Sequence, residues 1–330
     1  MVPLVSIAPM LQWTDRHYRY LMRNITKHTL LYTEMVMDDA ITYNLDNLVQ
    51  YIGHSTIEHP LAIQLGGKNI EKLTYATKIC DQYSDFTHIN LNCGCPSNKA
   101  LSVGYGAELM CLEPEYIRQL CYSMCRVTTN AEVTVKCRLG TTPSRTTSGE
   151  WEDLISFIEA VKAAGVKQII IHARNCMLKG LSPAQNRTIP PLQYNVVYKL
   201  VAAYPELKFI INGGIKTHEQ IDGFLNMNNN NTGSNSDNNN NINNGEDSPH
   251  IHPHGVMIGR QAYNYPWTLS GIDTKYYPTQ SQSKQLSRHD VIENYLDYCV
   301  DMQDNQCFGA TIQNLVKPLH NIFMGCPMLR

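Results

Sequence analysis

Short, nearly continuous apolar runs recur along the chain. They alternate with longer stretches whose apolar residues are spaced as on one face of a helix. Eight such runs, none longer than eight residues, lie at residues 5–10, 30–36, 61–67, 88–95, 133–140, 167–174, 208–214 and 255–261. They are rich in isoleucine and valine and are closed by glycine, cysteine, arginine or proline. This pattern is typical of strands buried on both faces, as in a parallel sheet.

Helical segments are predicted between these runs. Residues 69–80, 114–125 and 150–164 each place apolar side chains on one face, and Pro114 stands in a first helical turn, where its missing N–H costs little. Eight strands joined mostly by helices favour a (β/α)8 TIM barrel over an open doubly wound sheet. The barrel is expected to span residues 1–273.

Three other segments depart from this alternation. Residues 226–244 contain 12 asparagines in 19 positions, which predicts a disordered insertion at about 226–248. Residues 274–287 resemble a linker. Residues 288–330 regain a helical pattern, which predicts a small C-terminal helical domain, incomplete because the chain stops without a cap.

Composition narrows the class of protein. The chain has 330 residues, 43% of them hydrophobic, and a net charge of −2. No apolar run approaches the roughly 18 residues needed to cross a bilayer. Eleven scattered cysteines form no disulfide framework and no zinc-ligand spacing. We therefore expect no membrane association, no metal and a reducing compartment, namely the cytoplasm, with an organelle as the alternative. The protein is also expected to be a monomer.

Polar residues end nearly every predicted strand. In such barrels the active site lies at the carboxyl ends of the strands, so these side chains are expected to converge on one rim. The residues read at these strand ends are Pro9, Met10, Glu34, Gln64, Asn92, Cys95, Lys136, Arg138, His172, Arg174, Asn212, Gly213, Gly214, Gly259 and Arg260. One such residue alone is more often structural; the set as a whole indicates a ligand site.

Individual chemistry can be assigned within the set. The Asn212–Gly214 and Gly259–Arg260 turns follow the seventh and eighth strands, where this fold often binds phosphate, although two tight turns would look the same. Lys136 can stabilise negative charge on a ring, whereas His172 is nearly as well explained as a buried structural residue. Cys95 lies on a loop bounded by glycine and proline, and its thiol can donate a proton. Cys93 is interpreted as packing.

These residues resemble the tRNA-dihydrouridine synthase family, most of all its DusA-like branch. The resemblance covers about residues 5–225 and 255–325, and residues 179–191 point to that branch. Its motifs are Ala8-Pro9-Met10, Trp13 to His17, Gln64 to Gly67, Asn90 to Asn92, Gly94 to Ser97, Val135 to Arg138, His172 to Arg174, Leu178 to Pro183, Asn186-Arg187, Ile211 to Ile215 and Gly259-Arg260.

The resemblance implies an FMN enzyme that reduces a D-loop uridine of tRNA (position 20 or 20a), with NADPH as the reductant. Cys95 would be the proton donor. The FMN-binding positions would be Pro9, Met10, Gln64, Lys136, His172, Asn212, Gly213, Gly214, Gly259 and Arg260. The tRNA-facing positions would be Asn92, Arg174, Lys179 and Arg187.

A basic surface should then face the RNA. Further candidates are Arg16, Arg19, Arg23 and Lys27 on the first helix, for which a solvated helix face is the alternative, and Lys99, Arg138 and Arg145 after strands. The domain at 288–330 is acidic on balance, which is unexpected for a tRNA-binding unit. Two other functions stay open: an FMN oxidoreductase acting on a free pyrimidine, and an RNA-binding module with little turnover.

Overall fold

A computed structural model describes residues 4–83, 85–143, 149–226, 252–280, 285–304 and 310–326. The asparagine-rich insertion predicted at 226–248 lies outside these residues except for Asn226, which ends a helix with a positive φ of 53°. Arg145 also lies outside the described residues.

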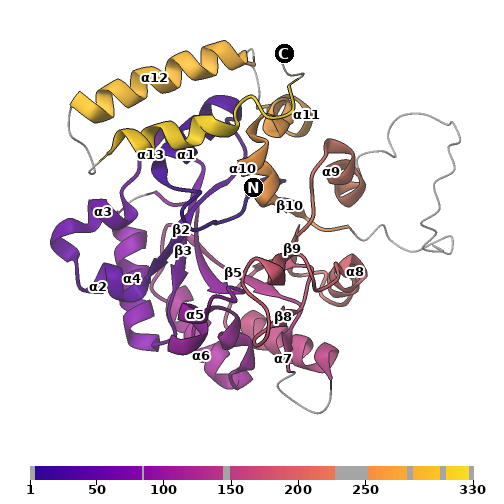
Figure 1. Cartoon of the computed structure of the whole chain (residues 1–330). Helices are drawn as coiled ribbons and strands as arrows, with labels where there is room; N and C mark the ends of the chain where they lie inside the picture. Colours follow the sequence, from indigo (N-terminus) through magenta and orange to yellow (C-terminus); the bar gives the residue numbers. More distant parts are fainter. Residues whose placement is uncertain are drawn as a thin grey trace, which may run out of the picture.

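All eight predicted strands are present and form one parallel sheet (Figure 1). They are β1 (Val5–Ile7), β2 (Leu31–Met37), β3 (Leu61–Gly66), β4 (His88–Cys93), β5 (Glu132–Arg138), β7 (Gln168–His172), β9 (Lys208–Asn212) and β10 (Gly255–Ile258). The strand order is β1-β10-β9-β7-β5-β4-β3-β2. Leu30 closes the circle, because its backbone bonds with Val5 and Ile7 of β1 at 3.1 and 2.9 Å. The fold is therefore a (β/α)8 TIM barrel.

Helices cover the outside of the barrel, and the three predicted segments appear as α4, α6 and α7. The helices up to the last strand are α1 (Arg16–Ile25), α2 (Asp38–Thr42), α3 (Leu48–Ile52), α4 (Ile70–Tyr83), α5 (Asn98–Val103), α6 (Pro114–Cys125), α7 (Glu150–Ala163), α8 (Tyr194–Ala203) and α9 (His218–Leu225). After the last strand come α10 (Arg260–Asn264), α11 (Ile272–Tyr276), α12 (Arg288–Asp304) and α13 (Ile312–Val316). A short strand pair, β6 (Thr141–Thr142) and β8 (Cys176–Met177), joins two loops after β5 and β7.

The C-terminal helices α12 and α13 pack beside α1 on one flank of the barrel (Figure 1). Tyr298 of α12 stacks on Tyr20 of α1 with ring centroids 3.9 Å apart, and its hydroxyl lies 2.8 Å from Nδ1 of His17. The linker predicted from residue 274 overlaps α11. Tyr276 and Tyr277 are buried there, so the start of this segment is packed structure rather than a free connection.

Across the described ranges, the structure contains no helix long and apolar enough to span a bilayer.

Candidate functional site

A cavity of about 690 Å³ opens at the carboxyl ends of the strands. It is lined by nine of the ten residues expected to bind FMN: Pro9, Met10, Lys136, His172, Asn212, Gly213, Gly214, Gly259 and Arg260. Arg187, expected to face tRNA, also contributes to the wall. The convergence predicted from strand ends is therefore observed for this set.

The turn after β9 has room for backbone and for little else. Gly213 and Gly214 have φ values of 117° and 71°, which side chains rarely adopt. A Cβ on Gly213 would lie 2.7 Å from Cδ2 of His172, and one on Gly214 would lie 2.5 Å from Leu192. Across the cavity, a Cβ on Gly259 would meet nothing within 4 Å. Gly213 and Gly214 are therefore packed against side chains, whereas Gly259 faces open space. The backbone of both turns lines the cavity, as an anion site requires.

Two nitrogen-bearing side chains on the cavity wall have shifted pKa values. Burial lowers the pKa of Lys136 to about 8, and nearby Arg138 lowers it further. Burial also lowers the pKa of His172 well below its ordinary range, with Arg138 and Lys136 acting in the same direction. His172 is therefore neutral at pH 7. An anionic ligand would relieve this concentration of positive charge.

Cys95 lies half-buried on the loop after β4 and does not line the cavity wall itself. Its backbone is held firmly: its N–H and that of Gly94 both donate to Oδ1 of Asn92, each at 3.0 Å. The N–H of Ala107 donates to the Cys95 carbonyl at 3.0 Å. Cys93, by contrast, is fully buried, which confirms it as a packing residue.

A chain of amides links the Cys95 loop to the barrel interior. Nδ2 of Asn92 donates to Oε1 of Gln64 at 2.8 Å, and Nε2 of Gln64 donates to Asn90 at 2.8 Å. Gln64 is 1% exposed and, unlike the other expected FMN residues, does not line the cavity. Asn92 was expected to face tRNA. In the structure its amide nitrogen bonds to Gln64 and its amide oxygen bonds to the Cys95 loop.

Arg138 has a role that the sequence did not indicate. It was expected on an RNA-facing surface, but it is 2% exposed, so that expectation is wrong. Its Nε donates to the carbonyl of Gly94 at 3.2 Å, and its Nη1 donates to the carbonyls of Asn186 at 2.9 Å and Asn175 at 3.3 Å. A buried guanidinium therefore ties the Cys95 loop to the loop after β7.

The remaining rim residues differ in exposure. Lys179 is exposed, and Arg187 is exposed beside the cavity, with Arg260 donating to its carbonyl at 3.1 Å. Arg174 donates to the carbonyls of Thr188 and Pro190, so it anchors the loop after β7 that also carries Arg187. Burial lowers the pKa of Arg187, and the nearby Arg260 acts in the same direction.

Residues 6–233 match the dihydrouridine synthase (Dus) family. The chain belongs to this family. Two relatives called tRNA-dihydrouridine(20/20a) synthase align in sequence with nearly the whole of this chain. The protein from Shewanella oneidensis is 37% identical over 325 residues, covering 98% of this chain and 85% of its own. The protein from Synechocystis sp. is 35% identical over 323 residues, with the same coverage.

Solved structures support the fold of this dihydrouridine synthase family member. An old yellow enzyme homologue from Zymomonas mobilis superimposes with a TM-score of 0.52 at 9% identity, covering 86% of this chain and 90% of its own. A 2-naphthoyl-CoA reductase gives a TM-score of 0.54 at 8% identity, covering 82% of this chain and 49% of its own. At such low identity these likenesses concern the barrel alone.

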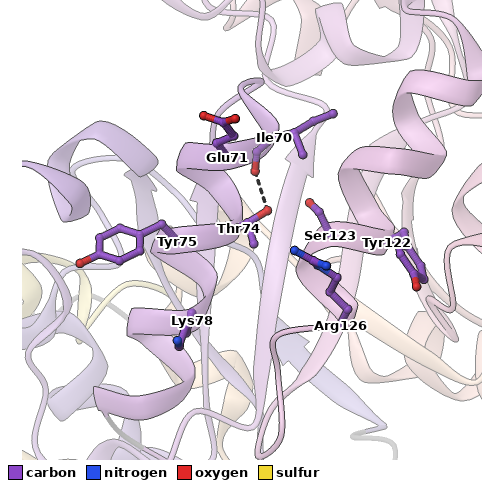
Figure 2. A pocket seen from close by; sticks show the side chains of 8 residues that line it. All are labelled: Ile70, Glu71, Thr74, Tyr75, Lys78, Tyr122, Ser123 and Arg126. Carbon is purple, nitrogen blue, oxygen red and sulfur yellow. Dashed lines mark hydrogen bonds between the residues drawn. The ribbon is translucent and has the colours of Figure 1, made fainter.

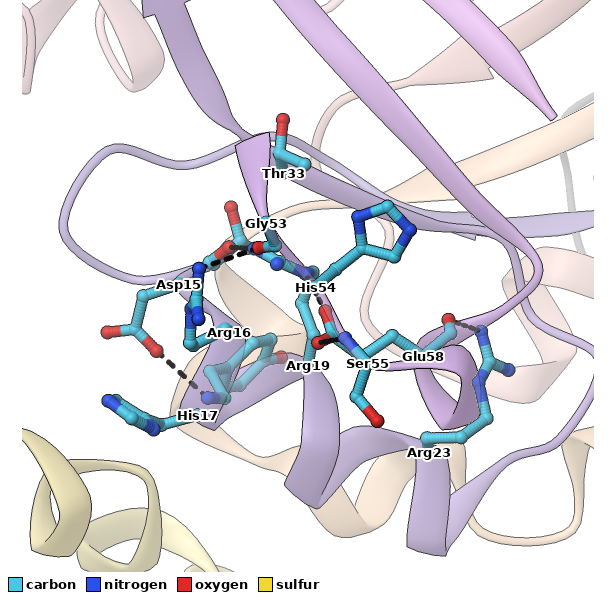
Figure 3. Close-up of polar contacts among 12 residues, drawn as sticks. Asp15, Arg16, His17, Arg19, Arg23, Thr33, Gly53, His54, Ser55 and Glu58 are labelled. Atoms are coloured by element: carbon cyan, nitrogen blue, oxygen red, sulfur yellow. Dashed lines mark hydrogen bonds and ion pairs between the residues drawn. The ribbon is translucent and has the colours of Figure 1, made fainter. Parts of the chain in front are cut away.

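The arginines of α1 do not form the RNA-facing stripe considered above (Figure 3). Arg19 is 4% exposed and pairs with Glu58 at 2.6 Å. Arg23 is 1% exposed and donates to four carbonyls, among them those of Glu58 and Pro60. Arg16 donates to the carbonyls of Val49 and Gly53. These arginines hold the loop before β3 in place, so the expectation was wrong for Arg19 and Arg23.

Two further hollows lie outside the main cavity. One of about 650 Å³ lies between the barrel mouth and the C-terminal helices, with Glu34 and Arg16 on one side and Asn314 and Lys317 on the other. The other, of about 470 Å³, is a groove between α4 and α6 on the outer face (Figure 2). It carries none of the expected site residues.

Proposed function

We propose that this protein is an FMN-dependent tRNA-dihydrouridine synthase that reduces the C5=C6 bond of a D-loop uridine, at position 20 or 20a, with NADPH as reductant. The observation that carries the proposal is the cavity at the barrel mouth, where two backbone-walled turns, Lys136 and a neutral His172 meet. The two relatives whose names specify 20/20a support the choice of substrate.

The residues present fit FMN. The turns at Gly213 and Gly259 would hold its phosphate with backbone N–H groups, and Arg260 would add a charge-assisted contact. His172, neutral and deep in the wall, can donate to or accept from the ribityl chain. Lys136, which lines the cavity, would stabilise negative charge on the ring system. The flavin, when bound, supplies the hydride for the reduction.

The protein's own contribution concerns the proton and the position of the base. Uracil's C5=C6 bond is conjugated to the C4 carbonyl, so hydride arriving at C6 leaves negative charge on C5 and O4. The thiol of Cys95 would donate its proton to C5, which completes 5,6-dihydrouracil. Asn92 and Arg138 would hold the Cys95 loop in register, since proton transfer depends on close approach.

The uridine must leave its stack to reach this cavity, which costs a few kcal/mol and is easier in a loop than in a helix. Arg187 and Lys179 at the rim would contact the RNA backbone. Arg174 would act indirectly, through the loop it anchors. The helical domain at 288–330 would offer a second tRNA surface beside the barrel. Such phosphate contacts should make binding weaken as salt rises.

The first test is the cofactor. The purified protein should be yellow, and if it takes up no FMN after reconstitution the proposal fails. The second is the product. With NADPH and unmodified tRNA, wild-type protein should form dihydrouridine at position 20 or 20a, and Cys95→Ala should still oxidise NADPH but lose most dihydrouridine. Equal product from Cys95→Ala would remove this thiol from the mechanism.

Two outcomes would favour the other functions. Reduction of free uridine or orotate at rates matching those on tRNA would identify an oxidoreductase of free pyrimidines. Colourless protein that still binds tRNA would identify a binding module. Mapping dihydrouridine in tRNA from cells that lack the protein would decide between these and the synthase.

A further inference from the structure

Two histidines and an aspartate meet at the end of the barrel opposite the cavity. His54 follows α3, His59 immediately precedes β3, and Asp85 lies between α4 and β4. One ligand atom from each lies within 4.8 Å of the others, and this is the one such group of three among the described residues. Figure 3 shows His54 next to Ser55 and Glu58, on the loop that the arginines of α1 hold in place.

The contact between His59 and Asp85 is close without being a hydrogen bond. Nε2 of His59 lies 3.0 Å from Oδ1 of Asp85, yet this buried nitrogen has no hydrogen-bond partner. An imidazole nitrogen and a carboxylate oxygen that lie close together and are not hydrogen-bonded to each other are suited to sharing a cation.

The tautomer of His54 suits the same purpose. Its Nδ1 lies 3.0 Å from the carbonyl oxygen of Ile52, which can only accept, so Nδ1 carries a proton and Nε2 is the ring nitrogen that would bind the cation. A backbone carbonyl on the far nitrogen is the usual way in which a protein orients a metal-binding histidine. The rings of His54 and His59 meet edge to face with centroids 5.0 Å apart, and His54 also packs on Phe86 at 4.6 Å.

We propose that His54, His59 and Asp85 form a site for a borderline divalent cation such as Zn²⁺. Two imidazoles and one carboxylate with solvent in the remaining positions suit such an ion. Ligand atoms about 2.1 Å from a tetrahedral ion are roughly 3.4 Å apart, so the 3.0 Å pair must open slightly and the third ligand must be brought into range, each by a small side-chain shift.

The place of the site defines its role. In this fold the active site lies at the carboxyl ends of the strands, whereas residues at the amino ends usually contribute to stability. The ion would clamp the connection before β3 to the connection before β4, and it would touch no residue of the cavity. It should therefore stabilise the fold and leave dihydrouridine synthesis unchanged.

The test is a zinc titration of the full-length protein by calorimetry, together with thermal unfolding. Wild-type protein should bind one equivalent of Zn²⁺ more than His59→Gln, and saturating Zn²⁺ should raise its Tm by on the order of 2–4 °C. Asp85→Asn should weaken this binding by roughly 10- to 100-fold. Asp85 is exposed, so this variant tests the site even where a histidine variant folds poorly.

His289→Gln is the matched control. His289 also lies near two carboxylates, at 4.0 Å from Asp290 and 3.9 Å from Glu293, but among the residues that the structure describes no second histidine joins them. Its loss should change neither the stoichiometry nor the Tm shift. Comparing variants also separates this site from zinc bound by cysteines, which all of them keep. Equal stoichiometry and equal Tm shifts in wild type, His59→Gln and Asp85→Asn would overturn the proposal.

Discussion

The turn at Gly213 gives the sharpest test of the cofactor site. Two features disfavour alanine at this position. The φ of Gly213 is 117°, and an added Cβ would lie 2.7 Å from Cδ2 and 3.1 Å from Nε2 of His172. Gly165, between α7 and β7, shares the first penalty with a φ of 98° but has nothing within 4 Å of its Cβ. Gly165→Ala therefore controls for backbone strain alone.

The magnitudes separate the two variants. Positive φ costs an alanine roughly 1–2 kcal/mol, and both variants should lose about that much stability. The Cβ at Gly213 must also displace the His172 ring or the turn itself, an overpacking cost of about 1–3 kcal/mol. Because that displacement distorts the cavity wall, FMN should bind roughly 5- to 150-fold more weakly to Gly213→Ala.

The assay titrates flavin-free protein with FMN and follows flavin fluorescence, with thermal unfolding of the same samples. Gly165→Ala should bind FMN as wild type does despite its lowered Tm. If Gly213→Ala binds FMN as tightly as Gly165→Ala does, the turn after β9 takes no part in holding the cofactor, and the reading of the cavity as an FMN site loses its main support.

Four further outcomes are expected. Arg138→Met should retain FMN and NADPH oxidation but lower dihydrouridine formation on the order of 100-fold through a displaced thiol, and Arg138→Lys should recover part of it; unchanged product would refute the anchoring role. Lys136→Met should stabilise flavin-free protein at pH 7. The wild-type lysine, with a pKa of about 8 in the folded protein, binds fewer protons in the folded than in the unfolded state between pH 8 and 10.5, so wild-type stability rises with pH in that window. Unfolding curves should therefore show the stability advantage of Lys136→Met over wild type shrinking as the pH rises from 8 to 10.5. Arg19→Ala should cost about 3–5 kcal/mol in denaturant unfolding by leaving buried Glu58 unpaired, whereas Arg187→Ala should leave stability unchanged and flatten the salt dependence of tRNA binding.

The barrel could be predicted from sequence because its strands are buried on both faces and so read as continuous apolar runs. The cavity could be predicted for a related reason. Carboxyl ends of parallel strands meet on one rim, so the residues that follow each run, such as Lys136 and Asn212, had to converge there. Nine of ten expected cofactor positions line the cavity, and only Gln64 points elsewhere.

The direction of long polar side chains could not be predicted. Arg138 ends β5 and Arg187 lies in the loop after β7, yet Arg138 turns inward to backbone carbonyls and Arg187 reaches the rim. Arg19 and Arg23 have the spacing of an exposed face, but the loop before β3 covers them with a carboxylate and carbonyls. These partners come from distant parts of the chain, and the sequence pattern near each arginine does not record them.

The way the barrel closes has a consequence for its biosynthesis. β1 is only three residues long and pairs with β10, the last strand of the barrel, and the N–H of Val5 donates to the hydroxyl oxygen of Tyr277 at 3.0 Å. During synthesis β1 therefore cannot pair with β10 until more than two hundred later residues have been made. Ring completion is a late event of synthesis, and until then the nascent chain exposes an unpaired strand edge that chaperones can recognise.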